Sequence, residues 1–136
     1  MKKIWYAPYK FESYGEEEIK AVEESLRSGW LGGQGPKSVE FEEKIAKRFG
    51  KKYGVFVNSG SSACLLAIAA LDLPKGCKII TPACTFSTTL APIIQLGYEP
   101  KFVDVGLNDY VADIAQVVAA ITPDVKAIML PNLIGN

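Results

Sequence analysis

The residues best suited to chemistry lie in three short polar stretches, at 58–62, 85–89 and 132–136, each shortly after residues that predict a strand. Residues 53–57 are β-branched and aromatic, which predicts a buried strand, and the Ala- and Leu-rich residues 61–72 predict a helix. The first amides of such a helix have no intrahelical partner, and the helix dipole makes that end positive. The turn therefore predicts a phosphate-binding site or, as the simpler alternative, serines that only cap the helix.

The sequence contains no histidine, which excludes Ser-His-Asp and Cys-His nucleophile arrangements and the common zinc sites within these 136 residues. Its three cysteines, Cys64, Cys77 and Cys84, are odd in number and lack metal-ligand spacing. We therefore predict reduced thiols and no metal site. Catalysis within the chain would have to use lysine, carboxylates, tyrosine, cysteine or a bound cofactor.

The charges are balanced overall but unevenly placed. Fifteen basic and fifteen acidic residues cancel, which argues against a nucleic-acid partner. Residues 1–52 carry 20 of these charges and residues 53–136 only 10, and a long segment poor in charge is typical of a parallel sheet covered by helices. The longest apolar run, residues 63–71, is too short to span a membrane, and the N-terminal residues lack the apolar core of a signal peptide. We therefore expect a cytoplasmic protein with no membrane partner.

The N-terminal part is predicted to be helical. Ser13 and Glu16 have capping-box spacing before a helix that ends at Gly29, and residues 37–49 predict a second helix. The basic residues near the end of the second helix are expected to form a solvated face paired with acidic ones; these residues are Lys44, Lys47, Arg48, Lys51 and Lys52 with Glu40, Glu42 and Glu43.

From residue 53 onward, predicted strands and helices alternate. After the first pair come strands over 78–81, 101–105 and 125–130, a helix through about Leu96 that contains Pro92, and a helix capped by Asp113. This alternation predicts an α/β fold, with a mainly parallel sheet and helices on both faces. Ligands of such sheets bind beyond the carboxyl ends of the strands, which is where the three polar stretches fall. We expect an N-terminal helical segment, residues 1–52, and an α/β domain, residues 53–136, that ends before its sheet is complete.

The three strand ends resemble the DegT/StrS family of pyridoxal-phosphate sugar aminotransferases, which has the aspartate aminotransferase fold, fold type I. The resemblance runs from about Gly15 to Asn136 in the family's order and spacing, through Ser-Gly-Trp-Leu at 28–31, Asn-Ser-Gly-Ser-Ser-Ala at 58–63, Pro-Ala-Cys-Thr-Phe-Ser-Thr-Thr at 82–89, Phe-Val-Asp-Val at 102–105 and Lys-Ala-Ile-Met at 126–129. It implies a truncated part of the large domain of that fold. It also implies pyridoxal 5'-phosphate or pyridoxamine 5'-phosphate as cofactor, a nucleotide-linked 4-keto sugar as substrate, and a homodimer.

The resemblance also implies a cofactor-binding set made of Gly60, Ser61, Ser62, Phe86, Thr88 and Asn132. The amides of Ser61 and Ser62, with a hydroxyl, would hold the cofactor phosphate. Phe86 matches the position that stacks on the pyridine ring, and ordinary core packing is its alternative. Asn132 lies where the family has a residue that faces the site.

The resemblance implies no catalytic residue in this chain. Asp104 lies near the end of the strand predicted over 101–105. The family's pyridine-nitrogen aspartate lies later in the chain, so we expect Asp104 to end its strand structurally. A pyridoxal-phosphate enzyme needs that carboxylate and usually a lysine that bonds to the cofactor, and in the family both come after residue 136. We therefore expect the 136-residue chain alone to be inactive.

Within the family, residues 58–71, 88–97 and 134–136 are most similar to the nucleotide-sugar 3-dehydratase branch, where histidine replaces the lysine. This implies a dehydratase of cell-surface polysaccharide, lipopolysaccharide or deoxysugar biosynthesis. One alternative is an aminotransferase that makes a 4- or 3-amino sugar. The alternative of another class is a non-catalytic module that binds a phosphate ligand or a protein partner.

Overall fold

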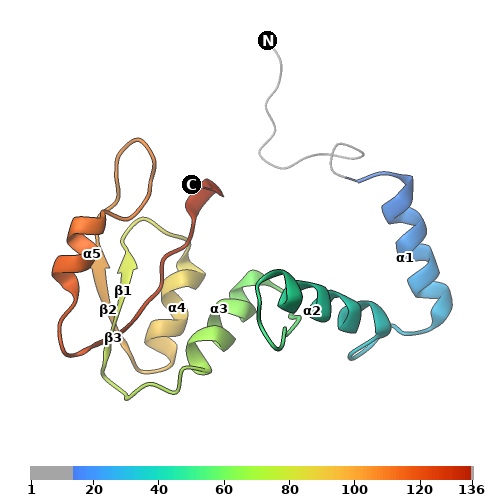
Figure 1. Cartoon of the computed structure of the whole chain (residues 1–136), viewed down its shortest axis with the longest axis horizontal. Helices are drawn as coiled ribbons and strands as arrows, with labels where there is room; N and C mark the ends of the chain where they lie inside the picture. The colour runs from blue at the N-terminus through green and yellow to red at the C-terminus, as the bar shows by residue number, and fades with distance from the viewer. Residues whose placement is uncertain (1–13, 136) are drawn as a thin grey trace, which may run out of the picture. The chain divides into compact units, whose positions relative to one another are not determined.

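The computed structural model describes residues 14–135 and divides the chain into two compact units, which we call the N-terminal unit, up to Phe56, and the C-terminal unit, from Val57. The N-terminal unit contains helices α1, Glu16–Ser28, and α2, Pro36–Arg48 (Figure 1). The C-terminal unit contains α3 (Gly60–Ala69), β1 (Lys78–Pro82), α4 (Ser87–Gln95), β2 (Glu99–Val103), α5 (Ile114–Ala120), β3 (Val125–Ile128) and a 3-10 turn (Leu133–Gly135). Within residues 14–135, no helix is both long and apolar enough to cross a membrane.

Helix α1 is capped by a glycine at each end. The N–H of Gly15 donates to Glu18 Oε2 at 2.7 Å, which is one half of a capping box, and this bond holds the pKa of the Glu18 carboxyl below its usual range. Ser13, the predicted capping residue, lies outside the described residues. At the other end Gly29 adopts φ +78°, and its N–H donates to the Leu26 carbonyl, so the predicted stop is confirmed.

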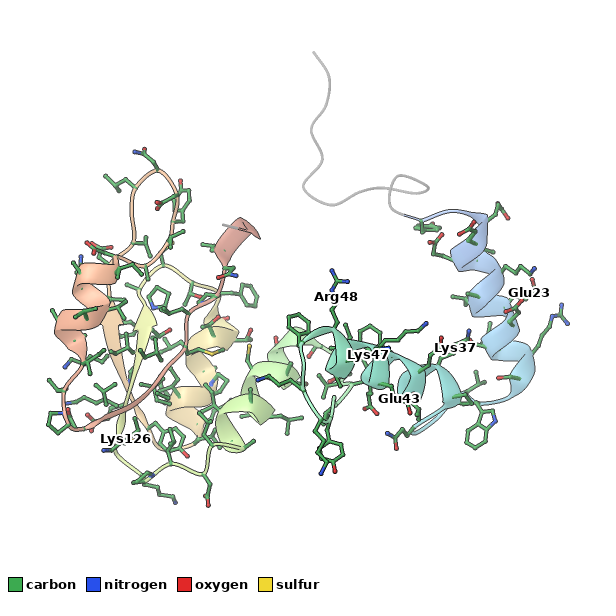
Figure 2. All side chains as sticks on the ribbon, viewed as in Figure 1. Glu23, Lys37, Glu43, Lys47, Arg48 and Lys126 are labelled. Atoms are coloured by element: carbon green, nitrogen blue, oxygen red, sulfur yellow. The ribbon has the colours of Figure 1, made fainter. Side chains whose placement is uncertain are left out.

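The charged face of α2 is only partly paired as predicted. Lys44 Nζ lies 2.6 Å from Glu40 Oε1, an i,i+4 ion pair that lowers the pKa of Glu40. Figure 2 shows that the labelled side chains of Glu43, Lys47 and Arg48 project from α2, and all three are exposed. Glu42 instead accepts hydrogen bonds from the Gln34 side chain and from the backbone N–H of Phe56.

Residues 53–57 form no strand, so the predicted buried strand is wrong. Tyr53 is 75% exposed, and none of the three described strands pairs with this segment. Without a neighbouring strand its β-branched and aromatic residues have no ladder to join. The segment instead lies against α2, where the Phe56 N–H donates to Glu42 Oε1 at 2.7 Å and the rings of Phe41 and Phe56 meet edge to face with centroids 5.3 Å apart.

The C-terminal unit is built on a three-stranded sheet of order β2-β1-β3 in which both pairings are parallel. The strand predicted over 78–81 is found with one residue more, whereas the one predicted over 101–105 runs two residues earlier, as β2. β3 is shorter than its predicted range of 125–130. The mainly parallel sheet that the sequence predicts is therefore confirmed.

Helices cover both faces of this sheet. Ile79 and Ile80 of β1 point to opposite faces, because successive strand residues alternate. Ile79 packs with Ile68 of α3 and Ile93 of α4, and Ile80 packs with Val117 of α5. Figure 1 shows α4 and α5 on opposite sides of the strands. The C-terminal unit therefore has three layers.

The amino ends of the strands are tied together by a polar network. Lys78 Nζ lies 2.6 Å from Asp124 Oδ2, and the Lys78 N–H donates to the Asp124 carbonyl. The hydroxyl of Thr122 donates to Asp124 Oδ1 and accepts a hydrogen bond from Lys101 Nζ. The hydrogen bond from Lys78 is the main reason that the pKa of Asp124 lies below its usual range. The network links the first residue of β1, the residue before β3 and Lys101 within β2. The ion pair of Lys78 and Asp124 lies at the end of the sheet opposite the predicted site.

Candidate anion-binding site

The candidate site is the first turn of α3. Ser59 is its N-cap residue, and its Oγ accepts a hydrogen bond from the Ser62 N–H at 3.1 Å. Gly60 and Ser61 supply the two preceding amides, which have no hydrogen-bond partner among the described residues. The Ser62 amide, predicted to hold a phosphate together with that of Ser61, is therefore engaged by the helix cap. The amides of Gly60 and Ser61, at the positive end of the helix, remain for an anion.

A second set of hydrogen bonds fixes the side chains of this turn. The Ser62 hydroxyl donates to Asn58 Oδ1 at 2.7 Å, and the Ser59 hydroxyl donates to Ser62 Oγ at 3.1 Å. None of the side chains at residues 58–62 is titratable, so the turn carries no charge of its own. Any attraction for an anion comes from the amides, the hydroxyls and the helix dipole.

Thr88 reaches this turn from the first turn of α4. The Ser61 hydroxyl donates to Thr88 Oγ1 at 3.0 Å, and both residues are half-buried. An open pocket of about 200 Å³ adjoins this pair and is lined by Ser61, Ser62, Leu65, Thr88, Ala91, Pro92 and Gln95. Pro92 has no N–H, so the Thr88 carbonyl lacks the usual helical partner four residues later. The structure thus brings together the predicted residues Gly60, Ser61, Ser62 and Thr88.

Within residues 14–135, the side chains of the other two predicted residues form no hydrogen bond with this group. Phe86 immediately precedes α4 and is 68% exposed, so its ring is not packed in the core. Asn132 is exposed after β3, and its carbonyl accepts a hydrogen bond from the Gly135 N–H. Their proposed roles on a cofactor ring stay predictions.

Two buried hydroxyls near the end of β1 lie outside the predicted cofactor-binding set, although Thr85 belongs to the polar stretch 85–89. Thr81 is fully buried and Thr85 is half-buried, and neither Oγ1 has a hydrogen-bond partner in residues 14–135. Thr81 shares the sheet face of Ile79, which α3 and α4 cover. A buried hydroxyl without a partner is unusual and costs free energy. The available signal for Thr81 was a polar residue directly after two isoleucines within a predicted strand.

Asp104 has the contacts expected of a residue that ends a strand. Its Oδ1 accepts from the Val105 N–H at 2.8 Å, and its own N–H donates to Gln116 Oε1 at 3.0 Å. Its carbonyl accepts from the N–H of Asp113, which caps α5 as predicted. In the described part of the chain, no group of three or more Cys, Asp or Glu side chains is arranged to hold a metal ion.

Comparisons with known proteins identify related chains. The model of the DegT/DnrJ/EryC1/StrS aminotransferase family matches residues 12–136. The chain is 40% identical over 128 residues to the spore coat polysaccharide biosynthesis protein SpsC of Bacillus subtilis (strain 168), which covers 94% of the chain and 33% of that protein. It is 41% identical over 135 residues to the GDP-4-keto-6-deoxy-D-mannose 3-dehydratase of Escherichia coli O55:H7 (strain CB9615 / EPEC), which covers 95% of the chain and 34% of that protein.

A solved structure has a similar fold. The E. coli GDP-4-keto-6-deoxy-D-mannose-3-dehydratase with bound hydrated PLP superposes with a TM-score of 0.75 and 40% identity, over 86% of this chain and 31% of that one. The chain spans about a third of the length of the curated relatives that it matches.

Proposed function

The chain belongs to the DegT/DnrJ/EryC1/StrS aminotransferase family, and on that premise we propose that it is the N-terminal part of an enzyme that uses pyridoxal or pyridoxamine 5'-phosphate on a nucleotide-linked 4-keto sugar. Within that class we propose a 3-dehydratase, in line with the similarity to the E. coli 3-dehydratase. The observation that carries the proposal is the first turn of α3, where two unpartnered amides lie beside the Ser61–Thr88 hydroxyl pair.

A cofactor phosphate fits the residues of this turn. Gly60 has no atom within 4 Å of the position that a Cβ would take, and its φ is not positive. Neither packing nor backbone conformation therefore requires glycine there. A side chain at this position would occupy the open space beside the helix start, where a phosphate approaches the amides.

The chain's own residues would hold and cover the cofactor. The amides of Gly60 and Ser61 and the hydroxyl pair of Ser61 and Thr88 would bind the phosphate, with Ser62 fixing the turn. The exposed ring of Phe86 would lie on the pyridine ring, and Asn132 would complete the set from the end of β3. When bound, the cofactor supplies an electron sink that stabilises negative charge at a substrate carbon.

The groups that move protons would belong to the remaining two thirds of the protein. The chain alone would then be inactive, and the full-length protein would be a cytoplasmic homodimer of cell-surface polysaccharide biosynthesis, lipopolysaccharide included. The division into a helical segment, residues 1–52, and a partial cofactor-binding domain, residues 53–136, is part of the same proposal.

The test uses the full-length protein with pyridoxal 5'-phosphate, an amino donor and a GDP-linked 4-keto-6-deoxy sugar. We expect a sugar product that has lost its C3 hydroxyl as water and carries no new amino group. Phe86→Ala should lower turnover, and the 136-residue chain should give none. A 4-amino sugar as the main product would return the assignment to the aminotransferases, and full-length protein that binds no cofactor would favour a non-catalytic module.

A further inference from the structure

We infer that Asn58 is a positioning residue for the cofactor phosphate. Its side-chain oxygen sets the direction of the hydroxyl hydrogens at the start of α3, so that a bound phosphate meets hydrogen-bond donors and no competing hydroxyls. The inference rests on the proposed function, because the ligand is the phosphate of that cofactor.

The direction of each hydrogen bond in this turn follows from Asn58. A side-chain amide oxygen accepts hydrogen bonds and cannot donate. Asn58 Oδ1 lies 2.7 Å from Ser62 Oγ, so the Ser62 hydroxyl uses its one hydrogen on Asn58. Ser62 Oγ then accepts the hydrogen of the Ser59 hydroxyl, 3.1 Å away. The Ser59 oxygen, in turn, accepts the Ser62 N–H.

This ordered set of bonds decides which donors remain for a phosphate. The hydroxyls of Ser59 and Ser62 and the Ser62 N–H are all engaged within the turn. The amides of Gly60 and Ser61 are unengaged among the described residues. The Ser61–Thr88 pair shares one hydroxyl hydrogen across 3.0 Å and therefore keeps the other. Three donors remain, and all of them lie in the first turns of α3 and α4.

Loss of the Asn58 oxygen would remove this order. The hydroxyls of Ser59 and Ser62 would then rotate freely, and phosphate binding would have to fix their directions at a cost in conformational entropy. The absence of charge on Asn58 matters as well. An aspartate at this position would accept the same hydrogen bond but would place a negative charge beside the phosphate, which repels it.

The experiment measures binding of pyridoxamine 5'-phosphate, and of pyridoxamine without the phosphate, to the full-length protein by equilibrium dialysis. We expect Asn58→Ala to weaken binding of the phosphorylated ligand about three- to tenfold, the equivalent of one hydrogen bond. Asn58→Asp should weaken it further, and added salt should reduce that difference. Binding of pyridoxamine should be unchanged in both variants. Asn108→Ala, which alters an exposed asparagine in the loop between β2 and α5, is the matched control and should bind both ligands as the wild type does.

The possible outcomes distinguish a failure of the proposed function from a failure of the role given to Asn58. Wild-type protein that does not prefer the phosphorylated ligand overturns both the proposed function and the role of Asn58. Wild-type preference with unchanged binding in Asn58→Ala overturns the role of Asn58 alone. Equal weakening of both ligands, together with a lower melting temperature of the ligand-free variant, indicates a merely structural residue and also overturns it. If Asn58→Ala does not fold, Asn58→Leu, which keeps a similar side-chain volume without the acceptor, takes its place, and a loss confined to the phosphorylated ligand is again expected.

Discussion

The two units bury their apolar residues to very different degrees. In the described part of the N-terminal unit, Ala46 is the only buried residue, and several large apolar side chains are more than half exposed, namely Val22, Leu26, Trp30 and Leu31. In the C-terminal unit, Ile79, Ile80 and Ile93 are fully inaccessible to solvent. The first unit therefore rests on local interactions within helices, whereas the second rests on packing between elements distant in sequence.

The ion pairs of the two units also differ in how far apart their residues lie in the sequence. The pairs of the N-terminal unit join residues four apart on one helix, Glu23 with Arg27 and Glu40 with Lys44. In the C-terminal unit, Lys78 pairs with Asp124 across 46 residues of sequence. An ion pair between residues four apart stabilises its helix whether or not another element packs on that helix. An ion pair between residues distant in sequence forms only when the sheet is folded. The difference between the units shows that a sequence pattern can predict a helix correctly and still not indicate which residues pack on its apolar face.

The largest expected effect contrasts a core residue with an exposed one. Ile79→Ala should lower the free energy of unfolding by about 2–5 kcal/mol, because it leaves a cavity under α3 and α4. Val22→Ala on α1 should change it by less than about 0.5 kcal/mol. Urea unfolding of both variants, followed by circular dichroism, measures the difference. Equal losses in the two variants would break the contrast between the units.

A smaller effect is expected at the one glycine of the N-terminal unit that packs closely on another segment. A Cβ at Gly54 would lie 2.6 Å from the Glu42 carbonyl oxygen, so Gly54→Ala should destabilise the contact of this segment with α2 by about 1–3 kcal/mol. Gly32 has open space around it and is the matched control, with little expected change on Gly32→Ala. Hydrogen exchange at the Phe56 amide reports the loss. An unchanged exchange rate would mean that this segment is not held by α2.

The smallest effect concerns the ion pair at the amino ends of the strands. The pKa of Asp124 is lowered in the folded chain, so its carboxylate stabilises the fold above the ordinary pKa of aspartate, about 3.9. That stability is lost as the pH falls through the ordinary pKa toward the lower folded one. Asp124→Asn should therefore lower the melting temperature at neutral pH. The difference in melting temperature between this variant and the wild type should become smaller in acid. Glu40→Gln on α2, the matched local pair, should leave the melting of the sheet unchanged, and a gap for Asp124→Asn that widens in acid would contradict the assignment.

Much of the C-terminal unit is predictable from the sequence because its signals are local. Asp113 precedes apolar residues at helical spacing, and it caps α5 as predicted by accepting from the N–H groups of Ala115 and Gln116. The run Ile79–Ile80 predicts a strand buried on both faces, which is found. Residues 53–57 carry an equally strong strand signal but have no partner strand among the described ones. Strand propensity reflects how well side chains pack on an adjacent strand, and the sequence of this segment does not show which strand, if any, lies beside it.

Some features of the candidate site are likewise predictable from local sequence, and others depend on tertiary contacts. The turn at Ser59–Ser62 is predictable, because small residues between apolar runs are typical of a helix start. The unpartnered hydroxyl of Thr81 and the bond between Asn58 and Ser62 are not, since both depend on which side chains meet in space. The hydrogen bond between Ser61 and Thr88 spans 27 residues and requires α3 and α4 to pack first.

The strand order β2-β1-β3 also sets how the sheet can assemble during synthesis. β1 leaves the ribosome before the other two strands and becomes the middle strand, so each later strand adds to a free edge without passing between strands already paired. A nascent chain can therefore form the β1–β2 pair, with α4 between the two strands in sequence, before β3 has been translated. Growth from the middle outward therefore closes the shorter sequence separation first, between β1 and β2, and leaves the longer one, between β1 and β3, to the last step.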